Sequence, residues 1–179
     1  QRRRDKLSTA ANFALLTGLM IPPAIVPTIW VMKAIGIYKS IPGMVLIEVA
    51  LNCSFSSILY RGFMGSIPRE IDEAAVIDGC GPLGLYSRII MPLLKPVTAT
   101  IIVLSTINIF NDFVNPMYFL PGTRNITVQQ TLYNYSGQYA NDYNLLFADV
   151  MLITIPPLLL FIFFNKQIVS GMMEGAVKG

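Results

Sequence analysis

Four segments of this chain are long and apolar enough to cross a lipid bilayer. A transmembrane helix needs about 20 mostly apolar residues to span the ~30 Å hydrocarbon layer. The segments are Leu7–Met32, Ile41–Tyr60, Leu93–Leu120 and Leu145–Phe164. Because a bilayer offers no water to backbone polar groups, only helices and closed barrels span it. The sequence therefore predicts an all-α polytopic membrane protein, with four transmembrane helices in one domain over residues 1–179.

The amino-acid composition and the absence of common motifs exclude several classes of function. Only 13% of the residues are charged, whereas a soluble domain is about 25% charged. The net charge is +3 and no basic stripe alternates with aromatic residues, so nucleic-acid binding is not expected. With no histidine, and with Cys53 and Cys80 far apart, neither a metal site nor a disulfide is indicated. The chain lacks a GxxxxGK[ST] phosphate loop and the common catalytic motifs, so no enzyme activity, catalytic residue or cofactor is expected in it.

Prolines and polar residues are expected to interrupt the first and third spans, and a proline pair lies at mid-depth in the fourth. Membrane helices tolerate such breaks because neighbouring groups satisfy the freed carbonyls. The first span should bend or break in its second half, and the third should be interrupted late. The residues concerned are Pro22, Pro23 and Pro27 in the first span, Asn111, Asp112 and Pro116 in the third, and Pro156–Pro157 in the fourth.

The distribution of lysine and arginine predicts the orientation, because short cytoplasmic loops carry an excess of both. Ten of the 13 lie on one side: Arg2, Arg3, Arg4, Lys6, Arg61, Arg69, Arg88, Lys95, Lys166 and Lys178. Lys33, Lys39 and Arg124 lie on the other. We therefore expect a multi-pass protein in the cell membrane of a prokaryote with both ends of this chain in the cytoplasm.

The stretch EIDEAAVIDGCGPLGLYSRIIMP, within the loop 66–92, is charged although it lies between two apolar spans. Its early carboxylates favour the start of a helix, with Pro68 in the first turn. Gly79 is a plausible left-handed stop, and a second helix should run from about Leu83 to Ile90 and end at Pro92. Spacing places Ile71, Ala74 and Ala75 on one narrow face that another surface could approach closely.

This stretch resembles the EAA loop of ABC-importer permease subunits. The matching residues are Glu73, Ala74, Ala75, Gly79 and Pro92, with Met91 where the family usually has leucine. RGFMGSIPREIDEAA and the terminal GAVKG resemble the carbohydrate permeases of the maltose-type second-subunit family. The resemblance covers essentially all 179 residues. Because family members have six spans, the four found here look like the last four, with the N-terminal spans missing.

The resemblance implies that the loop 66–92 holds a coupling helix seated on a cytoplasmic ATPase dimer, which binds ATP and magnesium. ATPase-coupling residues would be Ile71, Glu73, Ala74, Ala75, Gly79 and Pro92. The C-terminal residues Gly175, Ala176, Val177, Lys178 and Gly179 would make a second contact with the ATPase. Further partners implied are a second homologous permease subunit and an extracytoplasmic sugar-binding protein, which the outer loop 121–144 would probe.

Polar residues inside the spans are candidates for the substrate path, because polar groups in a membrane are costly. Asn108, Asn111 and Asp112 fall on one helical face and could bind sugar hydroxyls or pair with a neighbouring helix. The family often has tryptophan where this chain has Phe110. Glu48 and Asn52 form a second pair, which could be a packing hydrogen bond or a substrate contact.

The sequence thus favours a permease subunit of an ATP-driven, binding-protein-dependent carbohydrate importer. Two alternatives remain. An ion-coupled secondary carrier would use Asp112 and Glu48 as ion sites, and a membrane scaffold would use the loop 66–92 only to dock a soluble partner.

Overall fold

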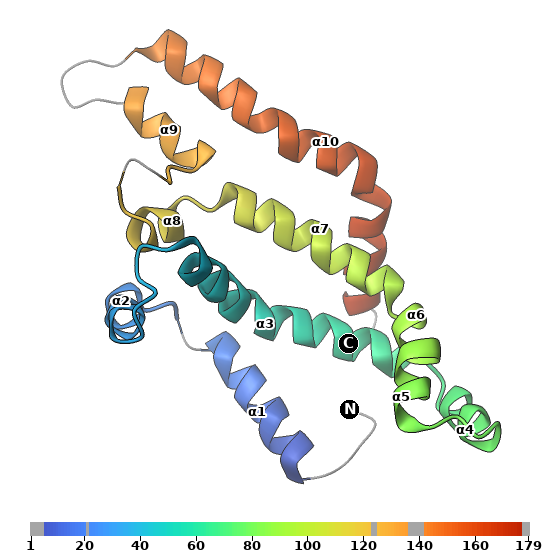
Figure 1. Cartoon of the computed structure of the whole chain (residues 1–179). Helices are drawn as coiled ribbons and strands as arrows, with labels where there is room; N and C mark the ends of the chain where they lie inside the picture. The colour runs from blue at the N-terminus through green and yellow to red at the C-terminus, as the bar shows by residue number, and fades with distance from the viewer. Residues whose placement is uncertain (1–5, 21, 123–124, 136–141, 177–179) are drawn as a thin grey trace. The chain divides into compact units, whose positions relative to one another are not determined.

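The computed structural model describes residues 6–20, 22–122, 125–135 and 142–176, and every regular element among them is helical (Figure 1). The helices are α1 (Lys6–Met20), α2 (Ile25–Ala34), α3 (Ile41–Ser66), α4 (Glu70–Ile77), α5 (Pro82–Gly84), the π-helix η1 (Leu85–Ile90), α6 (Met91–Leu93), α7 (Lys95–Asn111), α8 (Val114–Phe119), α9 (Val128–Tyr135) and α10 (Tyr143–Ala176). The predicted all-α class is confirmed.

Two helices of the described residues are long and apolar enough to span a bilayer. They are α3 and the stretch Tyr143–Asn165 of α10. The helices over Pro82–Leu93 and Lys95–Asn111 meet at a bend of 63° and would make a third span if they count as one. The predicted span Leu7–Met32 is divided into two shorter helices, α1 and α2, so two or three helices of the described residues qualify as spans by length and composition, where the sequence predicts four.

The first expected break is confirmed, because α1 ends at Met20 and α2 starts only at Ile25. Pro22 and Pro23 lie between them, where neither can donate a helical hydrogen bond. Pro27 lies in the first turn of α2, a position at which the missing N–H costs nothing. In α10, by contrast, Pro156 and Pro157 lie inside a continuous helix.

The chain divides into two compact units. The first contains Gln1–Met20, Cys53–Leu104 and Phe164–Gly179, and the second contains Ile21–Asn52 and Ser105–Phe163. The first unit therefore holds the charged loop 66–92, and the second holds the loop 121–144.

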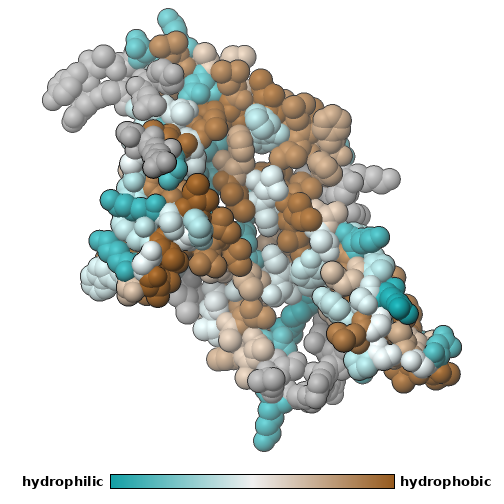
Figure 2. Space-filling view, in the orientation of Figure 1, coloured by the Kyte–Doolittle hydropathy of each residue, from teal (hydrophilic) through white to brown (hydrophobic). Residues whose placement is uncertain are grey.

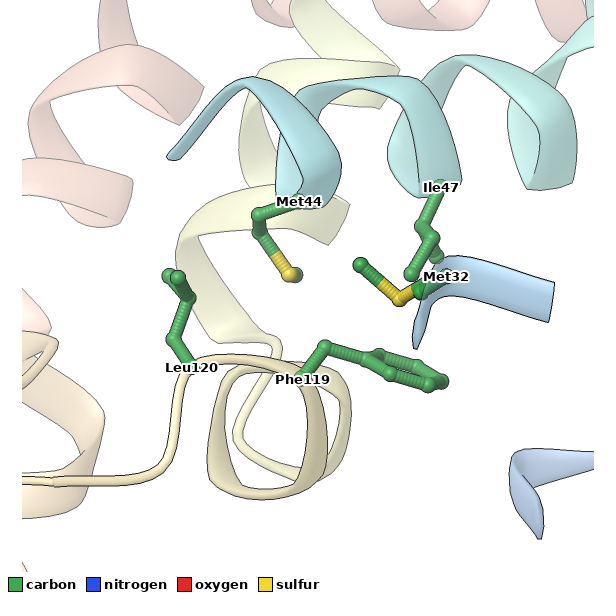
Figure 3. Close-up of a cluster of buried hydrophobic side chains, with 5 residues drawn as sticks. All are labelled: Met32, Met44, Ile47, Phe119 and Leu120. Atoms are coloured by element: carbon green, nitrogen blue, oxygen red, sulfur yellow. The ribbon is translucent and has the colours of Figure 1, made fainter. Parts of the chain in front are cut away.

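A methionine-rich cluster forms the core of the second unit. Met32, Met44, Ile47, Phe119 and Leu120 are buried and point toward one another (Figure 3). Methionine is unbranched and fills irregular gaps between helix ends. Gly43 allows this close packing, because a Cβ there would collide with the Ile37 carbonyl oxygen.

Close helix contacts also mark the first unit. Gly18 of α1 lies so near α3 that a Cβ on it would sit 2.6 Å from the Ser54 Oγ. Small residues at such contacts let membrane helices approach one another. Ile90, Leu94, Val97 and Ile101 are buried in a separate cluster beside the second half of α3.

The described surface of α10 over Tyr143–Asn165 is largely apolar. Phe147, Met151, Leu152 and Phe163 of α10 are each 65–72% exposed, and apolar side chains cover much of the visible surface (Figure 2). A soluble protein rarely exposes so much contiguous apolar area, whereas lipid covers it at no cost. The surface agrees with the membrane location that the sequence predicts.

Candidate functional site

The acidic end of the loop 66–92 is the short helix α4. Three carboxylates, Glu70, Asp72 and Glu73, lie in its first turn, where the helix dipole stabilises negative charge. The expectation that Pro68 occupies this turn is wrong. The backbone amides of Asp72 and Glu73 both donate to the Arg69 carbonyl, so Arg69 is the N-cap residue of α4. Pro68 therefore lies before the helix.

The stop of α4 at Gly79 is as predicted. Gly79 has φ of +77°, the left-handed conformation that strains residues with a side chain. Its amide donates to the Val76 carbonyl at 3.0 Å, and the Cys80 amide donates to the Ala75 carbonyl at 2.9 Å. This pair of bonds is the Schellman arrangement, which satisfies the last carbonyls of a helix. The end of α4 is therefore fixed by hydrogen bonds in addition to backbone preference.

The second helix of the loop does not end at Pro92. It passes from α5 through η1 into α6, and the Met91 amide donates to the Tyr86 carbonyl, five residues back. Pro92 lies inside α6, and the chain bends only at Leu94. In an α-helix the proline ring clashes with the carbonyl four residues earlier. The wider π turn before Pro92 relieves that conflict, so the helix continues.

The small-residue face expected on α4 is divided between two environments. Ala75 is 5% exposed and Ile71 is half-buried, whereas Ala74 and Glu73 are exposed. Because α4 contacts η1, the buried side packs within the chain itself. The sequence reasoning missed the apolar residues that remain open, which are Val76 (62% exposed), Ile77 (85%) and Leu83 (84%). An exposed apolar group with a rim of charge is typical of a surface that binds another protein.

Four polar side chains of the second unit form a group that we call the polar cluster: Glu48, Asn52, Asp112 and Asn115. The Asn52 side-chain amide donates to the Glu48 carbonyl at 2.9 Å and lies 3.4 Å from its Oε2. The Asp112 carboxylate accepts from the Asn115 backbone amide at 3.1 Å and from its side chain at 2.6 Å. Glu48 also lies within interaction range of Asp112 and Asn115. Two pairs that the sequence left separate are therefore one cluster.

One polar atom of this cluster is buried without a partner. Oε1 of Glu48 has no hydrogen bond in the described part of the chain. Burial of an unsatisfied oxygen is unfavourable, so a native structure usually supplies a ligand, a water or a partner group. The cluster can therefore accept a hydrogen bond from a hydroxyl group or hold a proton or cation.

The predicted strip of Asn108, Asn111 and Asp112 is not continuous. Helix α7 ends at Asn111, so Asp112 lies in the break before α8. There its carboxylate caps α8 through the Asn115 amide, which is why it leaves the helical face. Asn108 and Asn111 are exposed on α7. The contact with Asn115 was not predicted, although aspartate is a residue type that often caps the start of a helix.

The loop 121–144 contains α9, which is held at two points. The rings of Phe113 and Tyr133 stack with their centroids 5.0 Å apart and an interplanar angle of 7°. The Thr131 Oγ1 lies 2.8 Å from Oδ2 of Asp149 in α10. Part of the predicted loop 121–144 lies outside the described residues.

Of the predicted C-terminal contact, Gly175 and Ala176 belong to the last turn of α10. Val177, Lys178 and Gly179 lie outside the described residues. No group of three or more His, Cys, Asp or Glu side chains in the described ranges is placed to hold a metal ion.

The fold and the two sites together define a multi-span helical membrane protein with a structured loop between its apolar helices. The chain belongs to the family described as binding-protein-dependent transport system inner membrane components, whose model matches residues 1–174. This assignment confirms a transport component located in a membrane rather than an enzyme.

Several curated relatives are similar over most of the chain. A melibiose/raffinose/stachyose import permease protein of Bacillus subtilis is 36% identical over 99% of this chain and 66% of its own length. A multiple sugar-binding transport system permease protein of Streptococcus mutans is 34% identical over 92% of the chain and 60% of its own length. A probable permease for starch degradation products of Thermoanaerobacterium thermosulfurigenes is 32% identical over 76% of the chain and half of its own length. The chain thus spans one half to two thirds of these relatives.

Proposed function

We propose that this chain is part of a permease subunit in an ATP-driven, binding-protein-dependent carbohydrate importer. Family membership supports the importer class, and three relatives with names that refer to sugars support an oligosaccharide as the substrate. ATP and magnesium would be bound by a cytoplasmic ATPase dimer, since this sequence carries no phosphate loop. A second homologous permease subunit and an extracytoplasmic sugar-binding protein would complete the assembly.

The coupling site is the loop 66–92, with the exposed side of α4 as the surface that contacts the ATPase. The observation that carries this proposal is that α4 has a fixed end and also lies beside exposed apolar side chains. The Schellman stop fixes α4, while Ile77 and Leu83 stay 85% and 84% exposed. A rigid helix with open apolar groups can transmit a displacement, whereas a flexible loop would absorb it. The loop and both ends of the chain would lie in the cytoplasm. The C-terminal residues 175–179 would make a second contact.

The substrate path would pass the polar cluster and the exposed amides of Asn108 and Asn111. Carboxylate and amide groups can bind sugar hydroxyls, and Glu48 has a buried oxygen free to accept such a bond. No covalent chemistry is required. Sugar would cross as the assembly alternates between outward-open and inward-open states.

Reconstitution of the assembled importer in proteoliposomes tests this function. We expect uptake of radiolabelled oligosaccharide. The uptake should require ATP on the side of the membrane that carries the ATPase, and the sugar-binding protein on the opposite side. A charged residue at the exposed surface, Ile77→Glu, should abolish co-purification with the ATPase. Glu73→Trp, beside the same surface, should uncouple hydrolysis from uptake. Full uptake and normal assembly in both variants would rule out the coupling site.

A second candidate function is an ion-coupled carrier. It is favoured by one observation, the proximity of the Glu48 and Asp112 carboxyl groups. This alternative predicts uptake driven by a proton or sodium gradient without ATP. Glu48→Gln should then abolish the gradient-driven uptake, because glutamine cannot bind a proton or carry a charge. The ATP-driven importer would retain transport, because the glutamine oxygen can still accept a hydrogen bond from the sugar.

A further inference from the structure

The bend between the loop 66–92 and the span α7 is braced by α3. Ile90, Leu94, Val97 and Ile101 are buried on the loop and α7 side of the contact. The side chains packed against them include Leu59, Tyr60, Phe63, Met64 and Ile67 of the end of α3 and the residue that follows it. The contact lies within the first unit, and most of it is apolar.

A polar contact crosses this apolar interface. The hydroxyl oxygens of Tyr60 in α3 and Thr98 in α7 lie 3.0 Å apart. The Thr98 hydroxyl also lies 2.8 Å from the Leu94 carbonyl oxygen. Because Thr98 has a single hydroxyl proton, donation to Leu94 leaves its oxygen to accept from Tyr60. The bonds then form a relay from the Tyr60 hydroxyl through Thr98 to the Leu94 carbonyl.

Leu94 is the residue at the bend itself. Its amide donates to the carbonyls of Ile90 at 3.0 Å and Met91 at 3.2 Å, and its carbonyl accepts from the Thr98 amide at 2.9 Å. Pro96 follows in the first turn of α7 and has no N–H to donate back across the bend. Backbone hydrogen bonding is therefore reduced where the two helices meet at 63°. A side-chain brace matters most at such a point.

We propose that Tyr60 and Thr98 are positioning residues that set the bend at Leu94 and so make the coupling loop transmit ATPase motion to α7. A displacement applied to α4 reaches η1 through their contact. With the relay intact, η1, α6 and α7 move together against α3. Without it, the bend flexes and part of the displacement is lost. This role rests on the importer function proposed above.

The test measures sugar molecules transported per ATP hydrolysed by the assembled importer in proteoliposomes. Tyr60→Phe and Thr98→Val each remove one hydroxyl and keep the shape of the side chain. We expect Tyr60→Phe to lower the ratio about twofold to tenfold, the effect of one lost hydrogen bond. Thr98→Val should lower it at least as much, because it also removes the bond to the Leu94 carbonyl. Hydrolysis should continue. The double variant should be no worse than the worse single one, because both remove the same bond. Thr98→Ser keeps the hydroxyl and should retain the ratio.

Matched controls come from hydroxyls outside the relay. Tyr38→Phe removes a hydroxyl that donates to the Tyr118 carbonyl in the second unit, and Thr154→Val removes one that bonds within α10. Both should leave the ratio unchanged. The inference is overturned if Tyr60→Phe and Thr98→Val keep the wild-type ratio or lose uptake and hydrolysis in proportion. Additive losses in the double variant, or failure of Thr98→Ser, also overturn it. Absence of ATP-driven uptake in the wild type would overturn the proposed function itself, a distinguishable result.

Discussion

The Thr131 hydroxyl of α9 lies 2.8 Å from Oδ2 of Asp149 in α10. This contact joins the short helix of the outer loop to the long C-terminal helix, across 18 residues of sequence. Together with the stacked rings of Phe113 and Tyr133, it gives α9 two separate attachments. The outer loop therefore carries an anchored helix, and its position should depend on these contacts.

The one Thr131 hydroxyl proton is shared between the Asp149 carboxylate and the Val128 carbonyl of α9, which lies 2.6 Å away. We expect Thr131→Val to speed amide hydrogen exchange in α9 by up to about tenfold, because a hydrogen bond to a carboxylate is worth about 1.5 kcal/mol. Hydrogen exchange of the purified importer, read by mass spectrometry, measures this. Thr154→Val is the matched control, since its hydroxyl bonds to the Val150 carbonyl of its own helix. Equal exchange in α9 for both variants would show that the contact does not hold the loop.

Removal of the outer loop tests its proposed role with the sugar-binding protein. Deletion of residues 122–139 should abolish uptake while the ATPase still co-purifies. A milder variant, Val128→Lys, places a charge on a side chain that is 52% exposed and should weaken stimulation of hydrolysis by the binding protein. Unchanged uptake in the deletion variant eliminates this role.

Gly79→Ala should cost about 1–2 kcal/mol of stability, because the left-handed conformation strains any residue with a Cβ. No atom lies within 4 Å of the position that this Cβ would occupy, so the cost is one of backbone conformation alone. Gly81→Ala is the control, because Gly81 has an ordinary φ of −69° and equally open space. Thermal unfolding of the detergent-purified importer should separate the two, and equal midpoints would contradict the account of the stop.

Substitution by leucine should have different effects at Ala75 and at Ala74. Ala75→Leu overpacks a buried position and should cost about 1–3 kcal/mol of stability. Ala74→Leu is exposed and should leave stability unchanged but reduce ATPase co-purification, because it alters the proposed contact surface. Unfolding and pull-down assays on the same preparations check both. A stable Ala75→Leu variant would mean that α4 is not packed as described.

We expect some residues of the proposed substrate path to affect stability and others to affect sugar uptake. Asp112→Ala leaves the Asn115 amide uncapped and should cost about 0.5–2 kcal/mol of stability. Asn108→Ala and Asn111→Ala, on the exposed side of α7, should instead raise the KM for sugar uptake with little change in stability. Uptake kinetics and thermal unfolding test this division. If both asparagine variants keep the wild-type KM, these amides do not line the path.

Features fixed by neighbouring residues could be predicted from the sequence. The acidic first turn of α4, its stop at Gly79 and the break at Pro22 and Pro23 all follow from local preferences of the backbone. The same holds for the late interruption of the third apolar segment. Each of these predictions needed only a few adjacent residues and no knowledge of packing.

Features that depend on distant residues could not be predicted. Periodicity places Ala74 and Ala75 on one face but cannot tell which of them the chain buries. Nothing local brings Glu48 near Asp112, because the two are 64 positions apart along the chain. The sequence predicts a helix end at Pro92, since the π turn that accommodates this proline has no reliable sequence signal. The contact between Asp112 and Asn115 is a partial exception, because aspartate is a common capping residue.

The π turn of Leu85–Ile90 also bears on how the loop would tolerate a change of length. An α-helix rotates by roughly 100° per residue. A π turn closes its hydrogen bond over five residues instead of four, so it holds one more residue in about the same rotation. Loss of one residue from these six would therefore let the segment rewind as an ordinary α-helix while α4 keeps its direction. The apolar side chains of Ile77 and Leu83 would stay in place, and a chain shorter by one residue here could still fit the same ATPase.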